Sequence, residues 1–361
     1  MEFLLTLAAG FVIGAVFFKL KVPGGMMVGA IVGAAILNIF AGHAYMPDMA
    51  QQAAKITAGA FVGCSVERED LIRLRHIYKP FAAMMTAMLV LNLLVGFVIY
   101  KLTDLNLLTS LLCAVPGGVG VLPLIAQDMG ADATSVAVMQ FARMVVGVGF
   151  FPTFILWVDR MQRPLPEAAA ETASPPAAKT EPSKEKKSVQ DFLSRHKPFF
   201  TAAACAVVCG AVGVISPIPS GGMLLSMLGI LGLKLMRVPV HLPRWVRRCG
   251  QLLAGCYVGY SVTYRDLLDL RQLAVPILIM LAGYLLNSYL SGRMLHRFFG
   301  LTLKQGMLAN SPAGASDMAL ISADIGVQSA DVIILQVLRM LMAVSVFPYL
   351  MHFLARIAAG I

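Results

Sequence analysis

Two arginines lie inside long apolar stretches of the chain, and each follows a glutamine by three positions. The pairs are Gln140 with Arg143 and Gln336 with Arg339. On a helix, this spacing places both side chains on one face. A guanidinium group that faces lipid is costly, so each arginine is expected to face a partner or a water-filled cavity. These four side chains therefore predict either a site for a negatively charged solute or buried ion pairs.

The alternative to a solute site is a pair between each arginine and a carboxylate. Asp128 and Asp324 are the obvious partners for such pairs. The role of the pairs would then be structural, because each buried charge would be satisfied by the other. Both interpretations hold together if the carboxylate is displaced when an anion binds.

Helix-breaking residues interrupt two of the apolar stretches at corresponding places. One break is Pro116-Gly-Gly-Val-Gly120, and the other runs from Asn310 to Asp317 as Asn-Ser-Pro-Ala-Gly-Ala-Ser-Asp. Proline removes a hydrogen-bond donor and glycine loosens the backbone, so amides and carbonyls become available inside the stretch. Paired breaks indicate a transporter binding site, and the alternative is a packing kink. The candidate binding residues are Pro116, Gly117, Gly118, Gly120, Gln140, Arg143, Asn310, Ser311, Pro312, Gly314, Ser316, Gln336 and Arg339.

The composition is that of a protein built from membrane-spanning helices. Of the 361 residues, 58% are hydrophobic and 13% are charged, and the mean hydropathy is +0.78. Soluble domains carry about 25% charged residues. The net charge of +10 does not predict nucleic-acid binding, because the basic residues lie in loops at the ends of apolar stretches. These features exclude a soluble enzyme, a disordered chain and a DNA-binding domain.

Apolar segments follow one another along the chain, and we expect an all-α polytopic membrane protein. The first segment is predicted to be a retained helix, because the N-terminus lacks the basic region and cleavage site of a signal peptide. The predicted segments cover residues 2–19, 24–40, 50–66, 80–100, 106–127, 133–158, 198–215, 221–236, 248–263, 274–292, 303–323 and 329–354.

A polar stretch in the middle of the chain divides these segments into two sets. Residues 161–197 are rich in Ala, Pro, Glu and Lys, a composition typical of a flexible linker. We therefore expect a first membrane repeat over residues 1–160, a cytoplasmic linker over 161–197, and a second membrane repeat over 198–361.

The two predicted repeats match each other at a constant offset of 196 residues. The match extends over most of each half, so a common origin by duplication is predicted, with broken helices in each half. The matched pairs are Gly59/Gly255, Gly63/Gly259, Ser65/Ser261, Asp70/Asp266, Pro116/Pro312, Asp128/Asp324, Gln140/Gln336, Arg143/Arg339 and Phe151/Phe347.

The basic residues of matched loops are complementary, which predicts that the repeats are inverted in the membrane. Lys19 and Lys21 lie in the first loop, whereas the matched loop 216–220 has no charge. Loop 41–51 has no Lys or Arg, whereas its match, 234–248, has five. Lys and Arg are retained on the cytoplasmic side, so such loops lie on opposite faces. Inversion needs an odd number of crossings in each half, and the fifth segment is our candidate for one that does not cross.

Four motifs occur twice and in the same order along the chain. They are Gly-Gly-Met, Gly-x-x-x-Gly-x-Ser-Val-x-x-x-Asp-Leu, Pro-x-Gly and Gln-x-x-Arg. This pattern resembles the AbrB-type membrane protein family, whose members carry two AbrB duplication domains and are unrelated to the soluble DNA-binding regulator of that name. Family members have been labelled as regulators of gene expression and as ammonia monooxygenases. The segment order is more distantly similar to cation/proton antiporters and bile-acid-type symporters, which implies inverted repeats with crossed, broken helices.

Two functions follow as hypotheses. The first is a secondary transporter of a small anionic or amphipathic solute in a bacterial inner membrane, worked by rocking of the inverted halves. Asp128, Asp317 and Asp324 would couple ions or protons to that movement. The second is a membrane-bound regulator or sensor that acts on gene expression indirectly, through the linker and loop 234–248. The expected partners are the lipid bilayer and a small-molecule solute, with a homo-oligomer left open and no direct nucleic-acid binding.

Neither histidine nor cysteine is arranged as in an enzyme. The six histidines are scattered, without a metal-binding frame, and the six cysteines form no Cys-x-x-Cys motif. The sequence also lacks a Walker motif. We therefore expect no catalytic site, no cofactor and no bound metal.

Overall fold

The computed structural model describes residues 2–20, 22, 24–162, 189–264, 270–311 and 330–359. Within these ranges all regular secondary structure is helical, so the predicted all-α class is confirmed. Five stretches of the described residues are long and apolar enough to cross a membrane, which identifies a multi-pass membrane protein. They are Glu2–Lys19, Ile77–Leu102, Pro198–Ile215, Ala274–Phe299 and Asp331–Ala358.

Each half of the chain contributes a series of helices. The first half forms α1 (Glu2–Lys19), α2 (Gly25–Ala41), α3 (Asp48–Ser65), α4 (Arg68–Leu102), α5 (Leu107–Ala114), α6 (Leu122–Asp128), α7 (Ala133–Gly149) and α8 (Phe151–Gln162). The second half forms α9 (Val189–Ile215), α10 (Gly221–Leu235), α11 (Arg244–Gly259), the 3₁₀ helix η1 (Leu270–Leu273), α13 (Ala274–Phe299), α14 (Leu303–Ala309), α16 (Ala330–Ser345) and α17 (Phe347–Ala359).

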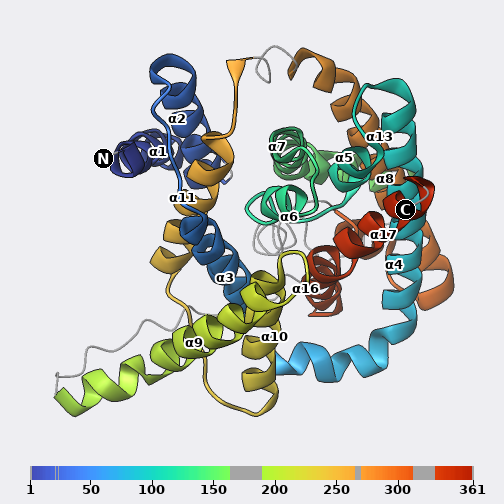
Figure 1. Cartoon of the computed structure of the whole chain (residues 1–361). Coiled ribbons are helices and arrows are strands. Elements are labelled where there is room, and N and C mark those ends of the chain that lie inside the picture. Colours follow the sequence, from blue (N-terminus) through green and yellow to red (C-terminus); the bar gives the residue numbers. More distant parts are fainter. Residues whose placement is uncertain are drawn as a thin grey trace.

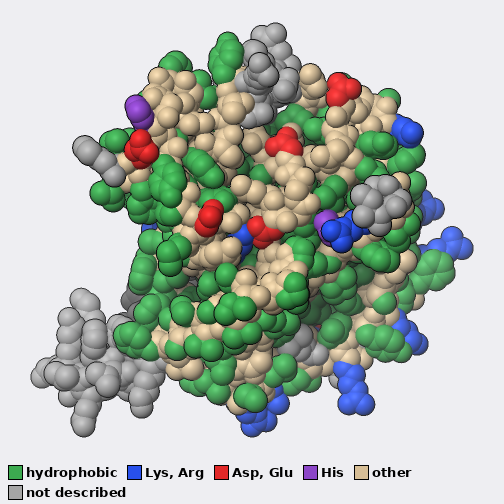
Figure 2. Space-filling model, in the orientation of Figure 1, with side chains coloured by type: hydrophobic (Ala, Val, Ile, Leu, Met, Phe, Trp, Pro, Cys, Tyr) green, Lys and Arg blue, Asp and Glu red, His purple; other side chains and the backbone are tan. Residues whose placement is uncertain are grey.

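The outer surface of these helices is apolar, as contact with lipid requires. Leu4, Phe11, Val208 and Leu278 are among the large apolar side chains that are more than half exposed. Figure 2 shows apolar side chains over much of one face, with Lys and Arg mostly at its lower and right-hand rim. Such a surface is unfavourable in water and stable in a bilayer.

Some predicted segments are each two helices in the structure. Segment 106–127 comprises α5 and α6, segment 133–158 comprises α7 and α8, and segment 329–354 comprises α16 and α17. Pro152 and Pro348 are the second residues of α8 and α17. Proline cannot donate a hydrogen bond to the preceding turn and is favoured at helix starts, which explains these two boundaries.

The predicted linker is shorter than residues 161–197. Helix α9 begins at Val189, so the end of the predicted linker is helical. No proline or glycine occurs from Val189 to Lys197, and nothing in that stretch breaks the helix. Residues 163–188 lie outside the described residues, as does most of the predicted segment 303–323 beyond Ser311.

The helices pack as two groups, and each group contains helices from both halves (Figure 1). We call α1, α2, α3, α9, α10 and α11 the panel group, and α4 to α8, α13, α14, α16 and α17 the core group. In Figure 1 the panel group lies to the left and below, and the core group lies to the right. Between the groups, α11 touches α6 and α7, and α3 touches α16.

Glycines allow α3 to pack closely on α10 within the panel group. A Cβ atom at Gly59 would lie 2.1 Å from the Met223 carbonyl oxygen, and one at Gly63 would lie 2.7 Å from the Met227 carbonyl oxygen. Small residues at these positions therefore allow the backbones of the two helices to approach closely. The contact residue on α10 advances by four positions, from Met223 to Met227, when the contact residue on α3 advances by four. Helices α3 and α10 therefore run parallel.

The same contact occurs between α2 and α11. A Cβ atom at Gly255 would lie 2.5 Å from the Met27 carbonyl oxygen, and one at Gly259 would lie 2.3 Å from the Ile31 carbonyl oxygen. All four positions differ by 196 residues from those of the α3–α10 contact. Each of these two helix pairs therefore contains one helix from the first half and one from the second half, so the halves are interlocked.

Two further contacts give the direction of the matched helices. Gly250 of α11 faces Thr57 of α3, and the Tyr257 hydroxyl near the end of α11 donates to Asp48 at the start of α3, at 3.3 Å. Helices α3 and α11 are therefore antiparallel. Since α2 is parallel to α11 and α3 is parallel to α10, the matched helices α2 and α10 run in opposite directions.

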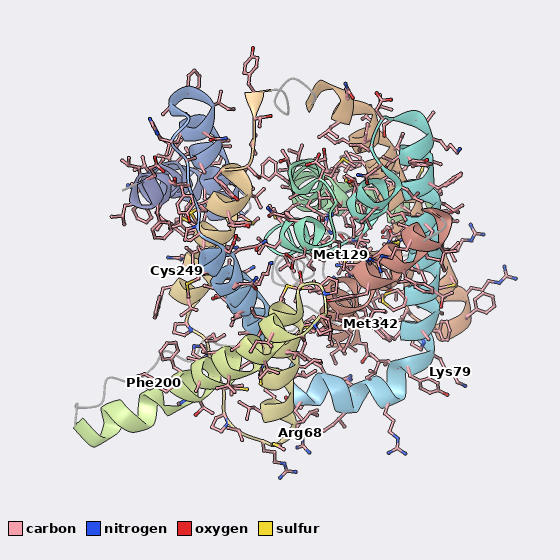
Figure 3. The ribbon with its side chains drawn as sticks, in the orientation of Figure 1. Arg68, Lys79, Met129, Phe200, Cys249 and Met342 are labelled. Carbon is pink, nitrogen blue, oxygen red and sulfur yellow. The ribbon has the colours of Figure 1, made fainter. Side chains whose placement is uncertain are left out.

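In the core group, a glycine also allows two helices to pack closely, and here both helices of each pair belong to the same half. Gly96 of α4 packs against Leu111 of α5, and Gly292 of α13 packs against Met307 of α14. Helix α4 bends at Ile77, and its first part, between Arg68 and Lys79 in Figure 3, turns away from the long second part. The long parts of α4 and α13 pack on each other and hold α5 and α14 in the middle of the group.

Candidate functional site

The predicted break in the fifth segment is present in the first half. Helix α5 ends at Ala114, α6 begins at Leu122, and residues 115–121 between them are not α-helical. Helix α5 has 8 residues and α6 has 7. At 1.5 Å per residue, neither piece approaches the thickness of a hydrocarbon core, about 30 Å. The two pieces therefore place backbone groups at depth instead of spanning as one helix.

Side chains from neighbouring helices satisfy the carbonyl groups at this break. Gln140 Nε2 on α7 donates to the Val115 carbonyl oxygen at 2.9 Å, and the Tyr284 hydroxyl on α13 donates to the Ala114 carbonyl oxygen at 2.8 Å. Arg143 Nη2 donates to the carbonyl oxygen of Gly117. The last carbonyls of a helix have no partner within it, so these side chains replace the missing turn.

The second half has a related arrangement where α14 ends. Gln336 Nε2 on α16 donates to the Leu308 carbonyl oxygen at 2.8 Å. Asn310 and Ser311 follow α14 and are fully buried. Arg339 is also buried, with 3% of its side chain exposed. Gln140 and Gln336 thus lie at the ends of the two short core helices, and each is followed three positions later by a buried arginine on the same helix.

The two arginines converge from matched helices on one tyrosine. The Arg143 guanidinium carbon lies 6.0 Å from the centre of the Tyr284 ring. Tyr284 interacts electrostatically with both Arg143 and Arg339, and the two guanidinium groups are close enough to repel each other. Within the described residues, no carboxylate forms an ion pair with Arg143. Arg143 therefore places a buried positive charge at the centre of the core group.

Several buried polar atoms on α5, α7 and α16 and directly after α14 have no hydrogen-bond partner among the described residues. Most buried polar atoms in proteins are hydrogen-bonded, so such a group of atoms indicates a place where a ligand can bind. The atoms are Ser110 Oγ, Gln140 Oε1, Arg143 Nε, Asn310 Oδ1, Ser311 Oγ and Gln336 Oε1.

Asp128 contacts residues of the panel group and does not form the predicted ion pair with Arg143. Its carboxylate contacts Lys55 Nζ at 2.5 Å and accepts hydrogen bonds from Ser220 Oγ at 2.5 Å and Gln51 Nε2 at 3.4 Å. For Asp128, a pair with Lys55 therefore replaces the expected pair with an arginine. The reason is that Asp128 ends α6 and faces the panel group, whereas Arg143 faces the break after α5.

The structure brings together most of the predicted site residues that it describes. Gln140, Arg143, Gln336 and Arg339 gather with the break and with the end of α14, whereas Gly120 faces Met27 of the panel group. The predicted residues Pro312, Gly314, Ser316, Asp317 and Asp324 lie outside the described residues.

The predicted site residues did not include Gln51, Lys55 and Ser220 beside Asp128, or Ser110 and Tyr284 of the core group. Lys55 gives a signal, because it is a single charge within the apolar segment 50–66. Tyr284, Ser110 and Ser220 give none, since their types are ordinary in membrane helices and turns. In the ranges that the structure describes, no three His, Cys, Asp or Glu side chains come close enough to hold a metal ion.

Comparison with known proteins gives matches over most of the chain. Residues 73–355 match the family described as "Transition state regulatory protein AbrB". The chain is 24% identical over 355 residues to "Putative regulator AbrB" of Escherichia coli (strain K12), a match that covers 95% of this chain and 93% of that protein. It is 23% identical over 300 residues to "Uncharacterized protein YhjN" of Bacillus subtilis (strain 168), which covers 80% of this chain and 74% of that protein.

Proposed function

This chain belongs to the AbrB family, and we propose that it is a secondary transporter of small anionic solutes in a bacterial inner membrane. One observation carries the proposal: Arg143 and Arg339, buried on matched helices, converge at interrupted backbone in the middle of the core group. The Arg143 guanidinium has no carboxylate partner among the described residues, so an anion bound beside it would compensate its charge. A broken helix in the middle of a helical membrane protein is typical of a transporter binding site.

The chemistry of the site favours a carboxylate or phosphate group. A guanidinium group presents parallel donors that match two oxygens of such an anion. The unpartnered side-chain oxygens of Gln140, Asn310 and Gln336 are acceptors, so they favour a solute that also carries hydroxyl or amino donors. The site thus fits a small polar acid better than an apolar one.

Movement is better supported between the panel and core groups than between the two sequence halves. The halves exchange helices in the panel group, so they cannot rock as separate bodies. The panel and core groups, in contrast, are each continuous, and the most extensive helix contacts lie within each group. The opposite directions of α2 and α10 support inverted repeats, which give a transporter two equivalent conformations open to opposite sides.

The first test measures anion binding to the purified full-length protein. Thermal unfolding is used to screen a set of anions. The set contains inorganic phosphate, sulfate, and mono- and dicarboxylates with and without hydroxyl or amino groups. A ligand at 100 times its Kd stabilises the folded state by about 2.7 kcal/mol, so we expect a rise in Tm on the order of 3 °C for an acid that binds. Arg143→Ala should remove this rise. Arg293→Ala is the control, because Arg293 is an exposed arginine of the same core group.

The second test uses the acid identified in this way. Proteoliposomes loaded with the unlabelled acid should take up the labelled acid by counterflow, and Arg143→Ala should reduce the initial rate at least tenfold. If none of the tested anions stabilises the protein, or if counterflow is the same in the Arg143→Ala and Arg293→Ala variants, the proposed function is wrong.

A second candidate function is indirect regulation of gene expression from the membrane. The observation that favours it is the printed description of the family and of the Escherichia coli relative as regulators. The linker over residues 161–197 would be its cytoplasmic contact. A transcriptional change that is lost when residues 163–188 are scrambled, while the membrane helices stay folded, would favour regulation over transport.

A further inference from the structure

Polar contacts join the panel group to the core group around Asp128. Besides the three contacts of this carboxylate with the panel group, the Tyr349 hydroxyl on α17 donates to the Pro219 carbonyl oxygen at 2.6 Å. Pro219 directly precedes Ser220, so the four contacts form one cluster. In Figure 3, Met129, the residue after Asp128, lies in the middle of the molecule between the panel helices and the core helices. This cluster must change whenever the two groups move relative to each other.

The ion pair in this cluster is buried. The Lys55 side chain is 2% exposed and the Asp128 side chain is 18% exposed. Their charges cancel while the groups are in contact. Separation would leave two uncompensated charges in a poorly solvated place, which is strongly unfavourable unless one of them is neutralised.

Ser220 adds evidence that this carboxylate has a dedicated environment. Ser220 has φ 53° and ψ 28°, in the left-handed region that favours glycine. The matched residue of the first half is Gly24, with φ 64° and ψ 16°. The two halves thus share one turn, and a serine is used only where its hydroxyl reaches Asp128. A strained serine in place of glycine indicates that the hydrogen bond to this carboxylate matters.

We propose that the Asp128 carboxylate is a proton-binding site that couples movement of the panel and core groups to a proton gradient, with Lys55 as its counter-ion. This inference rests on the proposed transport function. In the docked state, Lys55 is an ammonium ion and Asp128 is a carboxylate. When the groups separate, the carboxylate takes up one proton to become a carboxylic acid, and Lys55 remains an ammonium ion. The proton is released when the pair forms again.

The geometry favours a proton over a metal cation as the coupling ion. The Lys55 ammonium group and two hydrogen-bond donors already occupy the positions around the carboxylate oxygens where a metal ion would bind. Within the described residues, no group of three His, Cys, Asp or Glu side chains is present that could hold a metal ion here. One bound proton per conformational change is therefore the simplest stoichiometry.

The other titratable side chains around Lys55 and Asp128 do not form an ion pair between the panel group and the core group. Asp48 lies on the same helix as Lys55 and accepts a hydrogen bond from Tyr257, so this contact stays within the panel group. Tyr349 of the core group lies near Asp128, but phenol groups remain protonated at neutral pH. Asp48 also interacts electrostatically with Lys55 from within the panel group.

The test measures the distance between the groups by double electron–electron resonance, without any solute. One spin label is attached to the native, exposed Cys249 on α11, and the other to Phe298→Cys at the exposed end of α13, with the remaining five cysteines replaced. We expect one distance at pH 8 and a second distance whose population increases on acidification towards pH 5. Asp128→Asn, which mimics the protonated acid, should show the second distance at every pH.

Two further variants keep the test decisive. Lys55→Gln removes the counter-ion, so the contact between the groups is weakened and the second distance should be more populated than in the wild type at pH 8. Asp159→Asn breaks the ion pair with Lys304, which joins α8 to α14 inside the core group at 3.1 Å, and should behave like the wild type. If the wild-type distance does not depend on pH, or if Asp128→Asn and Asp159→Asn have the same pH profile, the proposal is wrong.

The outcome is separable from the fate of the proposed function. The Arg143→Ala variant, labelled at the same positions, should lose anion binding and keep the pH-dependent change in distance. A normal anion response with a pH-independent distance would reject the coupling site alone. Loss of the anion response in the wild type would reject the solute site alone.

Discussion

Tyr284, which belongs to the second half, contacts both the broken helix and the arginine of the first half. Its hydroxyl donates to the carbonyl oxygen of Ala114, and its ring lies beside the guanidinium group of Arg143. It is also 3% exposed, so its hydrogen bond cannot be replaced easily by bulk water. This residue therefore contributes both to the stability of the break and to the position of the charges.

Tyr284→Phe should separate these two contributions. The ring is kept and one buried hydrogen bond is lost, so the free energy of unfolding should fall by about 1 kcal/mol. The Ala114 carbonyl would then compete for the arginine donors, and the Kd of the anion should rise about tenfold. Thermal unfolding with and without the acid measures both effects. Tyr289→Phe, on the same helix but with an exposed hydroxyl that contacts Arg293, should change neither.

Arg143→Lys tests whether the geometry of the guanidinium group matters beyond its charge. Lysine keeps the positive charge but cannot donate to the Gly117 carbonyl and to two anion oxygens together. We expect an anion affinity between those of the wild type and Arg143→Ala, lower than wild type by about 1–2 kcal/mol. An affinity equal to that of the wild type would show that Arg143 acts only as a point charge.

At the residue scale, residue type and spacing predicted the polar faces well and their partners poorly. The three-residue spacing of Gln140 and Arg143 correctly predicts a shared face. The partner of Asp128 could not be predicted, because Lys55 lies 73 positions away in the chain and belongs to a different helix group. Such contacts are set by tertiary packing, which local spacing does not contain.

At the scale of the helices, glycine positions determine how the panel group assembles. A Cβ atom at Gly59 would collide with the backbone of α10, which cannot move aside as a flexible side chain can. A Cβ atom at Gly232, also in the panel group, would have nothing within 4 Å. Gly232 therefore serves as a control for Gly59, because Gly59 lies at a close helix contact and Gly232 does not.

Gly59→Ala should lower the stability of the protein in detergent by about 1–3 kcal/mol, the usual effect of overpacking. Gly232→Ala should be neutral or stabilising by up to about 1 kcal/mol, because alanine is the better helix former. Thermal unfolding followed by size-exclusion chromatography measures both variants. Equal losses in the two variants would show that the close contact between α3 and α10 is not a determinant of stability.

The extent to which helices were predictable depends on what ends them. The apolar segments 2–19 and 24–40 coincide closely with α1 and α2, because loops with lysine, proline or glycine separate them. The division of segment 133–158 was missed, since a Phe-Pro pair inside an apolar run can either bend a helix or start a new one. The Pro-Gly-Gly break was predicted, because several helix breakers occur together.

At the scale of the whole molecule, the two faces of the membrane are distinguished by one pair of matched contacts. Lys234 Nζ on α10 donates to the Val66 carbonyl oxygen after α3 at 2.8 Å. Asn38 Nδ2 on α2 donates to the Val262 carbonyl oxygen after α11 at 3.0 Å. The residues of the two contacts differ by 196 positions, so one contact is made at both ends of the panel group. A lysine makes it at one end and an uncharged asparagine at the other.

This difference predicts which side of the panel group faces the cytoplasm. Lys and Arg are retained on the cytoplasmic side, so the Lys234 end should face inward and the Asn38 end outward. Helix α10 begins at the outward end under this assignment, which places the uncharged loop 216–220 outside. Helix α1 ends at the inward end, which places Leu20 inside.

Cysteine labelling in intact cells tests this topology. In a cysteine-free background, Ile218→Cys should react with a membrane-impermeant maleimide from outside, because Ile218 is 40% exposed and lies in the uncharged loop. Leu20→Cys, at a residue that is 68% exposed, should react only after the inner membrane is opened. Equal exposure of both side chains to solvent is needed for a fair comparison, and labelling in detergent provides that control. If both cysteines react from the same side, matched loops share one face, the repeats are not inverted, and the panel and core groups lose the symmetry by which one site could open to either side in turn.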